Sequence, residues 1–393
     1  MKKLLVITPR FPYPVIGGDR LRIFEVCKEL AKYYDITLVS LCDSKSEINF
    51  IIPDDGVFKG VHRLYLPKWK SYLNCFLSLP TKRPLQVAYY YSKQFESLVK
   101  ELAKDHDMVV PHLIRTAEYA KTLDVKKVIE MTDAISMNYS RVSQIKNSSG
   151  IKGLIYRIEQ SRLNRYERNV AHFFDVNVFV SQVDKEFLYS DNKNLLDKAM
   201  VCSNGVDLSK LPYSFVPSGN KLVFIGNMYS AQNFDAAYWF AKEVLPKIRE
   251  YDDYEFHVIG KIPPDSQRKL SQFKGVIVTG AVESVAEYAY GALAGICSVR
   301  LAAGVQNKIL EYMALGIPTI TSSTGLEGLF AKEGESILVA DYPEEYVKHI
   351  LELKNNVVLA KTISQNAYGY VKKQHSWSGK LKPLVDRIHQ LLQ

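Results

Sequence analysis

The sequence lacks the marks of secreted and membrane-spanning proteins. Its five cysteines are scattered and form no CxxC pair, which argues against a disulfide framework and favours a reducing compartment. No apolar run reaches the roughly 18 residues that a membrane-spanning helix needs. The apolar stretch at residues 4–8 is too short for a signal-peptide core and is typical of a first buried strand. We therefore expect a cytoplasmic protein.

The sequence also lacks several signatures of cofactor and nucleic-acid binding. No histidine has cysteine or carboxylate partners at helical intervals, so we expect no metal site. No GxGxxG motif follows the first strand, so we expect no dinucleotide cofactor. The net charge of +9 is not accompanied by a recognisable nucleic-acid-binding module. Cofactors, metals and nucleic acid are therefore all expected to be absent.

What is present is a regular alternation of apolar strands and amphipathic helices. With 393 residues, of which 47% are hydrophobic and 24% charged, the chain suits two globular domains. In the first half, the predicted strands cover residues 3–8, 35–41, 108–112, 126–133 and 175–181. A helix predicted over residues 21–34 joins the first two strands, and its right-handed crossover implies a parallel sheet.

A segment rich in Pro, Ser and Gly, residues 209–220, is the best candidate for a linker. After it, strands predicted over 221–227, 254–260, 275–282, 294–300, 318–323 and 336–341 alternate with helices predicted over 235–250, 283–292, 306–316 and 343–356. This pattern predicts an α/β protein of two doubly wound, Rossmann-like domains, residues 1–205 and 206–375, facing a ligand cleft. The last helix, about residues 376–393, is expected to pack back on the first domain.

The excess of positive charge gathers in two segments, residues 62–100 and 141–168. In the first, Lys and Arg alternate with Trp, Tyr, Leu and Phe. Such a mixture suits peripheral contact with an anionic membrane, where cations meet lipid headgroups and rings lie at the interface. The alternative is a solvated helix pair whose aromatic side chains pack on the core. A long polar helix is predicted over about residues 141–173.

Two glycines, Gly17 and Gly18, stand between the first strand and the first helix. Paired glycines at this place let backbone N–H groups approach a ligand, near a helix N-terminus that favours negative charge. A plain tight turn is the alternative interpretation.

The stretch "SVRLAAGVQNKILEYMALGIPTI" has the second candidate site. Arg300 ends a strand, Gly304 and Val305 lie in the following loop, and Lys308 and Glu311 share one face of the next helix. A helix N-terminus with Arg and Lys would bind a diphosphate, and Glu311 would accept hydrogen bonds from the two hydroxyls of a ribose. The alternative is a Lys–Glu pair on the surface.

Polar residues near the ends of first-domain strands are candidates for binding a second substrate that accepts a group through a hydroxyl, here called the acceptor. Asp133 would orient an acceptor hydroxyl or stabilise positive charge, and it is equally suited to capping the next helix. Arg141 would bind an acceptor phosphate or pair with Asp133, and Arg115 is assigned to the acceptor as well.

The segment "GVQNKILEYMALGIPTITSSTGLEGL" resembles the donor-binding segment of retaining GT-B glycosyltransferases, in particular glycosyltransferase family four. "TPRFPYPVIGGDRLRIFEVCKELAK" resembles the first strand, glycine loop and helix of that family. "VCSNGVDL" and "VFIGNMYSAQNFDAAYWF" resemble the end of its first domain and the start of its second. These matches follow the family's order over nearly the whole chain.

The resemblance implies roles for individual residues. Glu311 matches the second glutamate of the family's paired-glutamate motif, which holds the donor ribose, and Gly17 and Gly18 match the loop near the donor phosphates and sugar. His112 resembles a first-domain histidine near the transferred sugar, although a core histidine is the alternative. The remaining residues matched to the donor site are Asn227, Gly304, Val305, Thr324, Gly325 and Leu326.

The chain departs from the family at two places. Ala303 stands where the first glutamate is expected, and the Arg and Lys usual after the first strand of the second domain are replaced by Asn227 and Asn233. We expect the diphosphate to be neutralised by Arg300 and Lys308 instead.

The function implied is metal-independent, retaining transfer of a sugar from a nucleoside-diphosphate sugar to a glycan acceptor. A lipid-linked acceptor in the biosynthesis of a bacterial capsule, O-antigen or exopolysaccharide fits the basic aromatic segment. The alternatives are a catalytically degenerate binding or scaffold subunit, which Ala303 favours, and a nucleotide-sugar epimerase of the same fold.

Overall fold

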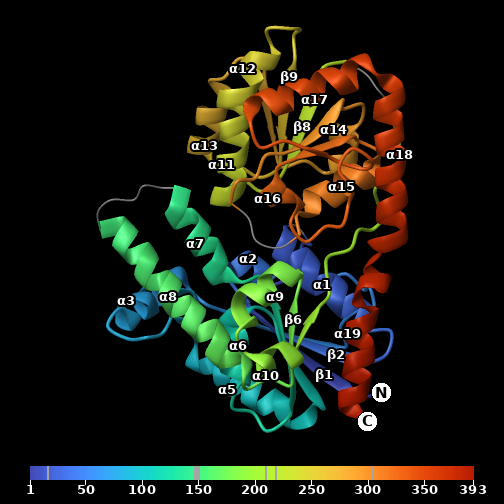
Figure 1. The fold of residues 1–393 in the computed structure, drawn as a ribbon. Helices are drawn as coiled ribbons and strands as arrows, with labels where there is room; N and C mark the ends of the chain where they lie inside the picture. Colours follow the sequence, from blue (N-terminus) through green and yellow to red (C-terminus); the bar gives the residue numbers. More distant parts are fainter. Residues whose placement is uncertain (16, 146–150, 209, 217–218, 302–304) are drawn as a thin grey trace. The chain divides into compact units, whose positions relative to one another are not determined.

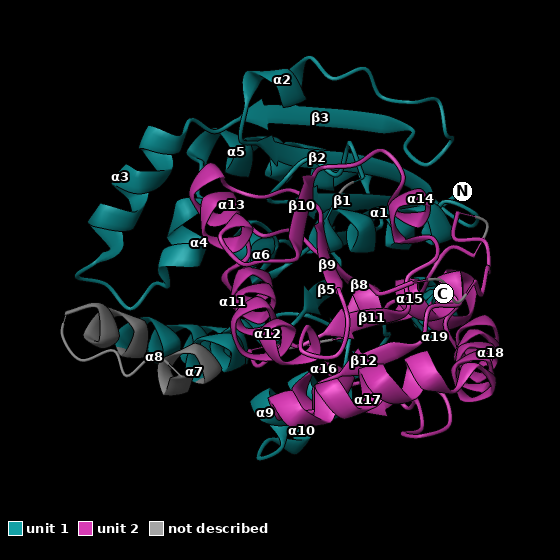
Figure 2. Ribbon diagram, turned by 90° about the horizontal axis from the view of Figure 1, so that it is seen from above, with its two compact units in different colours: residues 1–203, 381–393 teal, residues 204–380 magenta. Residues whose placement is uncertain are grey.

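The polypeptide divides into two units, each built on one parallel sheet (Figure 2). The computed structural model describes residues 1–393 except residues 16, 146–150, 209, 217–218 and 302–304, and except the side chains of residues 141–157. Unit 1 comprises Met1–Ser203 and Leu381–Gln393, and unit 2 comprises Asn204–Lys380.

The sheet of unit 1 has the strand order β3-β2-β1-β4-β5-β6-β7. Its strands are β1 (Lys3–Thr8), β2 (Asp35–Cys42), β3 (Gly60–Tyr65), β4 (Met108–Pro111), β5 (Lys126–Thr132), β6 (Val176–Phe179) and β7 (Ala199–Val201). The inner strands are almost wholly buried, as expected of a sheet covered on both faces. The edge strand β3 was not predicted, because its half-buried sequence GVHRLY has no continuous apolar run.

Helices surround this sheet (Figure 1). They are α1 (Gly18–Leu30), α2 (Lys45–Ile48), α3 (Lys68–Ser78), α4 (Leu85–Tyr89), α5 (Lys93–Leu102), α6 (Ile114–Ala120), α7 (Ile135–Ile145), α8 (Ile151–Ala171), α9 (Gln182–Tyr189) and α10 (Lys193–Asp197), with the 3₁₀ turn Ala103–Asp105. The single helix predicted over residues 141–173 is wrong, since two helices, α7 and α8, cover this region. The last helix, α19 (Trp377–Leu392), is tied to unit 1 by a hydrogen bond of 2.6 Å between the Tyr34 hydroxyl and His389 Nδ1.

The sheet of unit 2 has the strand order β10-β9-β8-β11-β12-β13. Its strands are β8 (Lys221–Ile225), β9 (Glu255–Ile259), β10 (Val276–Gly280), β11 (Ala294–Cys297), β12 (Thr319–Thr321) and β13 (Leu338–Val339). Its helices are α11 (Ala231–Trp239), α12 (Leu245–Ile248), α13 (Pro264–Ser271), α14 (Val285–Ala289), α15 (Asn307–Leu315), α16 (Ser323–Leu326), α17 (Pro343–Asn355) and α18 (Val357–Gln374).

The helix predicted over residues 235–250 is interrupted. A π-helical turn, Phe240–Val244, separates α11 from α12, and Pro246 lies in the first turn of α12. Proline has no N–H to donate and its ring clashes with the carbonyl four residues earlier, so a regular α-helix cannot continue through this position.

Both sheets reverse their strand order at one place. In unit 1 the reversal lies between β1 and β4, and in unit 2 between β8 and β11. Ligands of such sheets bind outside the carboxyl ends of the strands at this switch point. The predicted class, α/β with two doubly wound Rossmann-like domains, is confirmed. In the described part of the chain, no helix combines the length and the apolar character needed to cross a membrane.

Candidate functional site

The switch point of unit 2 is built around the contact between α15 and the two central strands. Gly295 in β11 has no room for a side chain, because a Cβ there would lie 2.4 Å from the Tyr312 ring. The buried Tyr312 hydroxyl accepts a hydrogen bond from the Ile225 N–H at 2.8 Å and donates one to the Ile296 carbonyl at 3.2 Å. One side chain thus fixes α15 against the ends of β8 and β11, and with it the residues on the first turns of α15.

Lys308, on the first turn of α15, is 7% exposed. Its ammonium donates a hydrogen bond of 2.8 Å to Asn233 Oδ1 and lies 4.8 Å from the centre of the Phe224 ring. Burial lowers the pKa of Lys308, and Cys297 and Glu311 oppose that shift. The interpretation of Lys308 as one half of a surface ion pair is wrong, because the side chain is buried. An ammonium has three N–H donors, and Asn233 takes one of them.

Glu311 follows one turn later and is half-buried. Burial raises its pKa to about 7, against the opposing charge of Lys308. Among the residues that the structure describes, no group donates a hydrogen bond to its carboxylate. An acceptor without donors in a low-dielectric setting is costly for the apo protein and well suited to binding hydroxyl groups.

Arg300, after β11, has partners that the sequence did not indicate. Its Nη2 lies 2.9 Å from both carboxylate oxygens of Asp235, and the guanidinium lies 5.5 Å from the centre of the Trp239 ring. Its Nε is buried and has no hydrogen-bond partner among the described residues. Asp235 offsets much of the cationic charge that the sequence analysis assigned to a diphosphate. Both partners lie on α11, about 60 positions earlier in the chain.

Asn227 belongs to the same group of residues as Lys308. Its carbonyl accepts a hydrogen bond of 3.1 Å from Asn233 Nδ2, so the loop after β8 is joined to Lys308 through Asn233. Val305 is buried just before α15. The N-cap residue of this helix, Gln306, makes no side-chain cap hydrogen bond. Gly304 lies outside the described residues, as does Ala303, which stands where the first glutamate of the family motif is expected.

Thr324, Gly325 and Leu326 form the short helix α16 after β12. Ser322 caps it, with its hydroxyl accepting from the Gly325 N–H at 3.0 Å. A Cβ at Gly325 would lie 2.3 Å from Thr321 Oγ1, so a glycine is required there. The structure places these three residues at a strand end of the same sheet, and no hydrogen bond between described residues joins them to Lys308 or Glu311.

At the switch point of unit 1, Gly17 precedes α1 with a φ of 101°, a conformation that favours glycine. Gly18 begins α1, and Asp19 occupies its first turn. Arg10 pairs with Asp19 at 3.2 Å. Burial of Asp19 is outweighed by Arg10, Arg115 and His112, so the pKa of this carboxyl is lowered. A carboxylate already stands at this helix N-terminus, which weakens its attraction for an anion.

His112 lies in a buried ionic cluster. Its Nδ1 is 3.0 Å from Glu130 Oε2, and Arg22 donates to Glu130 Oε1 from Nε and Nη2 at 3.2 and 3.0 Å. Burial would raise the pKa of Glu130, but Arg22 and His112 bring it down to about 2. Since Glu130 is an acceptor, Nδ1 carries the proton, and the buried Nε2 has no partner among the described residues. Sequence reasoning missed Glu130, although a charged residue inside the apolar strand "KKVIEMT" was a signal.

The other first-domain candidates are not brought into that cluster by direct contacts. Burial, Asp184 and Glu130 raise the pKa of Asp133 well above its ordinary value. Arg115 Nε donates to Gln86 Oε1 at 3.0 Å, and its guanidinium lies 5.4 Å from the centre of the Tyr90 ring. Arg141 falls in α7, and its side chain lies outside what the structure describes.

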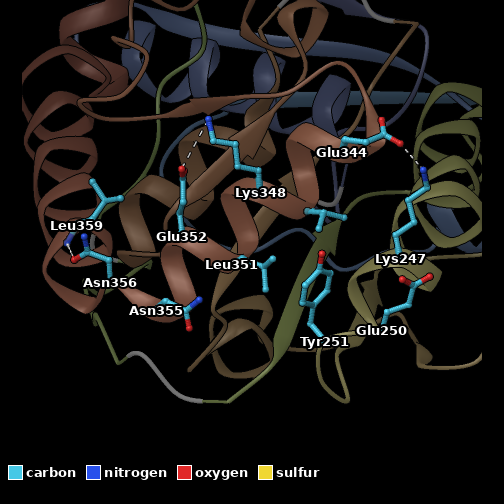
Figure 3. A pocket seen from close by; sticks show the side chains of 11 residues that line it. Lys247, Glu250, Tyr251, Glu344, Lys348, Leu351, Glu352, Asn355, Asn356 and Leu359 are labelled. Carbon is cyan, nitrogen blue, oxygen red and sulfur yellow. Dashed lines mark hydrogen bonds and ion pairs between the residues drawn. The ribbon is translucent and has the colours of Figure 1, made fainter.

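A separate hollow of about 970 Å³ opens beside α12 and α17 in unit 2 (Figure 3). Its rim carries an exposed ion pair between Lys247 and Glu344 and another between Lys348 and Glu352. It contains none of the predicted site residues. We therefore assign the candidate site to the switch point between β8 and β11.

Comparison with known proteins identifies the class of the second domain. Residues 219–356 match the family model "Glycosyl transferases group 1", and this span includes Lys308 and Glu311. An uncharacterized 44.6 kDa protein in the cps region of Klebsiella pneumoniae is 23% identical over 95% of this chain and 97% of its own length.

Solved structures show the same fold over the full length. The sucrose-phosphate synthase of Thermosynechococcus elongatus has a TM-score of 0.76 at 14% identity, with 100% of this chain and 99% of the other covered. Anabaena Alr3699/HepE, in complex with UDP and glucose, has a TM-score of 0.71 at 12% identity, covering 99% and 100%. With two Rossmann-like domains and a group 1 glycosyl transferase domain over residues 219–356, the chain is a glycosyltransferase of the GT-B fold.

Proposed function

We propose that this glycosyltransferase moves a sugar from a nucleoside-diphosphate sugar to a lipid-linked glycan acceptor, with retention of the anomeric configuration, in the biosynthesis of a bacterial surface polysaccharide. The observation that carries the proposal is the pair formed by Lys308 and Glu311. A buried cation and a carboxylate to which no described residue donates a hydrogen bond lie one turn apart on the helix at the switch point.

Lys308 is assigned to the donor diphosphate. Asn233 occupies one of its three N–H donors, which leaves two for phosphate oxygens. The backbone N–H groups of the first turn of α15, which has no side-chain cap, add the positive end of the helix dipole. When the bond between the sugar and the diphosphate breaks, negative charge grows on the leaving oxygen. A desolvated ammonium and a helix N-terminus held in place beforehand stabilise that charge.

Glu311 is assigned to the ribose hydroxyls of the donor. Two hydroxyl groups would supply the hydrogen bonds that its carboxylate lacks in the apo protein. The structures of HepE with UDP support a nucleoside-diphosphate donor for proteins of this fold. They support no particular base or sugar for this chain.

The acceptor is assigned to unit 1. His112 Nε2, which is buried and has no hydrogen-bond partner among the described residues, is the ring nitrogen that we assign to a sugar hydroxyl. Asp133 is retained as a hydrogen-bonding group for the acceptor, and burial, Asp184 and Glu130 raise its pKa. The relative in a Klebsiella cps region supports a role in surface polysaccharide biosynthesis.

A donor-binding experiment tests the proposal. The melting temperature of the full chain is measured with a panel of nucleoside-diphosphate sugars, because a ligand of the folded state raises it. We expect one donor to raise it, and we expect Lys308→Met and Glu311→Gln each to weaken that donor's affinity about tenfold, the loss of one charged hydrogen bond. Lys247→Met, outside the site, is the matched control. If Lys308→Met and Glu311→Gln folded proteins bind the donor as tightly as the parent, the assignment is wrong.

A further inference from the structure

Helix α3 of unit 1 exposes its apolar face to solvent, whereas an ordinary surface helix exposes its polar face. The aromatic side chains of Trp69, Tyr72 and Phe76 are 63%, 65% and 69% exposed. Their spacing of three and four residues puts them on one helix face. A surface helix normally buries such a face against the core. Here the face is in water.

The opposite face of α3 is polar and points into the protein. Ser71 and Ser78 are 1% and 6% exposed. Asn74 Nδ2 donates to the Tyr91 carbonyl at 2.8 Å, and Cys75 Sγ lies 3.6 Å from the Leu85 carbonyl. These contacts fix the rotation of the helix about its axis. The exposure of the rings is therefore determined by the orientation of the helix and not by the choice of side-chain rotamers.

The exposed apolar face continues beyond the three rings. It is made of Trp69, Tyr72, Leu73, Phe76, Leu77 and Leu79, hereafter the α3 face, each between 46% and 69% exposed. Figure 2 shows α3 at the margin of unit 1 beside α4. The interpretation that these side chains pack on the core is wrong. Contiguous exposed apolar patches of this kind mark surfaces that bind a partner or a membrane.

The chain segment that contains α3 carries charge of one sign. Residues 56–95 contain no Asp or Glu, and they include the exposed Lys68, Lys70 and Lys82 at the two ends of α3. Arg162 of α8 donates to the Leu79 carbonyl at 2.6 Å, which joins the C-terminal end of α3 to α8. Beside it, a hollow of about 420 Å³ is lined by Lys82, Arg162 and Arg165 together with small and apolar residues.

We propose that the α3 face binds the surface of an anionic lipid bilayer, with its rings at the level of the headgroups and its lysines against the lipid phosphates. Exposed rings and leucines on one face, flanked by cations and free of carboxylates, match the chemistry of that surface. A second copy docked through the same face would set lysines against lysines, because this helix and its flanks contain no carboxylate. The proposal concerns a part of unit 1 that takes no part in the donor site, although it agrees with a lipid-linked acceptor.

Flotation of the full chain with vesicles tests this proposal. We expect binding to vesicles of phosphatidylcholine with phosphatidylglycerol, and weaker binding at high salt, since exposed charges are screened. The double variant Trp69→Ser, Phe76→Ser should lose at least about tenfold in binding, because two large apolar side chains no longer leave water. Lys70→Gln with Lys82→Gln should reduce the preference for anionic over neutral vesicles.

The matched control removes two exposed rings from unit 2, Tyr251→Ser and Phe330→Ser, and should float as the parent does. All variants should keep the parent's melting temperature and its shift with the donor, which separates this proposal from the donor site. The proposal is overturned if the parent does not float or if the Trp69 and Phe76 variant floats equally well. It is also overturned if that variant turns a lipid-free dimer into a monomer in sedimentation, since the α3 face would then bind a second copy.

Discussion

The two switch points have the same topology and opposite electrostatics. In unit 1, Glu130 is enclosed by Arg22 and His112, and its pKa falls to about 2. In unit 2, Glu311 has no hydrogen-bond donor among the described residues, and its pKa rises to about 7. At the first site Arg22 and Glu130 pair with each other, and His112 Nε2 has no hydrogen-bond partner among the described residues. The second opposes the buried carboxyl of Glu311 with the charge of Lys308, which does not outweigh the effect of burial. Two sheets of the same topology can therefore carry either a carboxylate with hydrogen-bond donors or a carboxylate without one among the described residues.

The largest expected effect breaks the cluster of unit 1. Arg22→Met leaves the carboxylate of Glu130 buried with only His112 and Thr132 beside it. Removing one partner of a buried ion pair lowers the free energy of unfolding by about 3–5 kcal/mol. Urea denaturation of the full chain measures it.

The same substitution in unit 2 is the control for that comparison. Lys308→Met removes a buried cation that has no ion pair within 4.0 Å in the described residues, so we expect a smaller loss of unfolding free energy than from Arg22→Met. Equal losses from Arg22→Met and Lys308→Met would contradict the contrast between the two sites.

A second prediction uses pH. Glu311 has a folded-state pKa of about 7, above its ordinary value of about 4.3. The folded state therefore binds the extra proton between these values, and the contribution of Glu311 to stability falls as pH rises from about 4.3 to 7. For Glu130 the shift is downward, so its contribution is present above its ordinary pKa and is lost as pH falls towards 2.

The difference in unfolding free energy between the parent and Glu311→Gln isolates the first of these effects, because Glu167, whose pKa is also raised to about 7 by burial, is common to both. We expect the parent to lose stability relative to the variant as pH rises from about 4.3 to 7. Donor affinity should rise over the same range in the parent alone, since ribose hydroxyls bind the carboxylate form. A parent and variant with parallel pH curves would show that Glu311 does not titrate there.

The smallest expected effect concerns Arg300. Asp235→Asn removes the carboxylate that offsets its charge while keeping the side-chain volume. If Arg300 contacts the donor diphosphate, the affinity should rise about two- to fivefold, a change typical of partly exposed charge interactions. Titration calorimetry with the donor measures it, and Asp253→Asn on the same unit is the control. No change would indicate that Arg300 only anchors α11 to the end of β11.

The sequence predicted the parts of this molecule that depend on local pattern. Apolar runs such as residues 3–8 and 108–111 are strands, and the start of α15 falls where the loop before Lys308 indicated it. The partners of polar side chains could not be predicted in the same way. Arg22 and Glu130 meet across 108 positions, and Arg300 and Asp235 across 65, so no local periodicity reports them.

Helix α3 shows a different limit. Its sequence has an apolar stripe and a polar stripe of the same period, and the pattern alone does not say which stripe faces the protein. Burial in the folded chain decides that Ser71 and Ser78 face inward. The two interpretations left open by the sequence, packing on the core and contact with a membrane, differed only in that rotation.

The contact between Gly295 and Tyr312 has a consequence for engineering. The Tyr312 hydroxyl bridges Ile225 and Ile296, so this aromatic side chain and the space left for it help to place Lys308 and Glu311. A library that holds residues 295 and 312 constant and varies the loops after β8 and β11 would explore donor choice on an unmoved helix. A library that varies residue 295 would mostly displace α15, because any side chain there would clash with the Tyr312 ring.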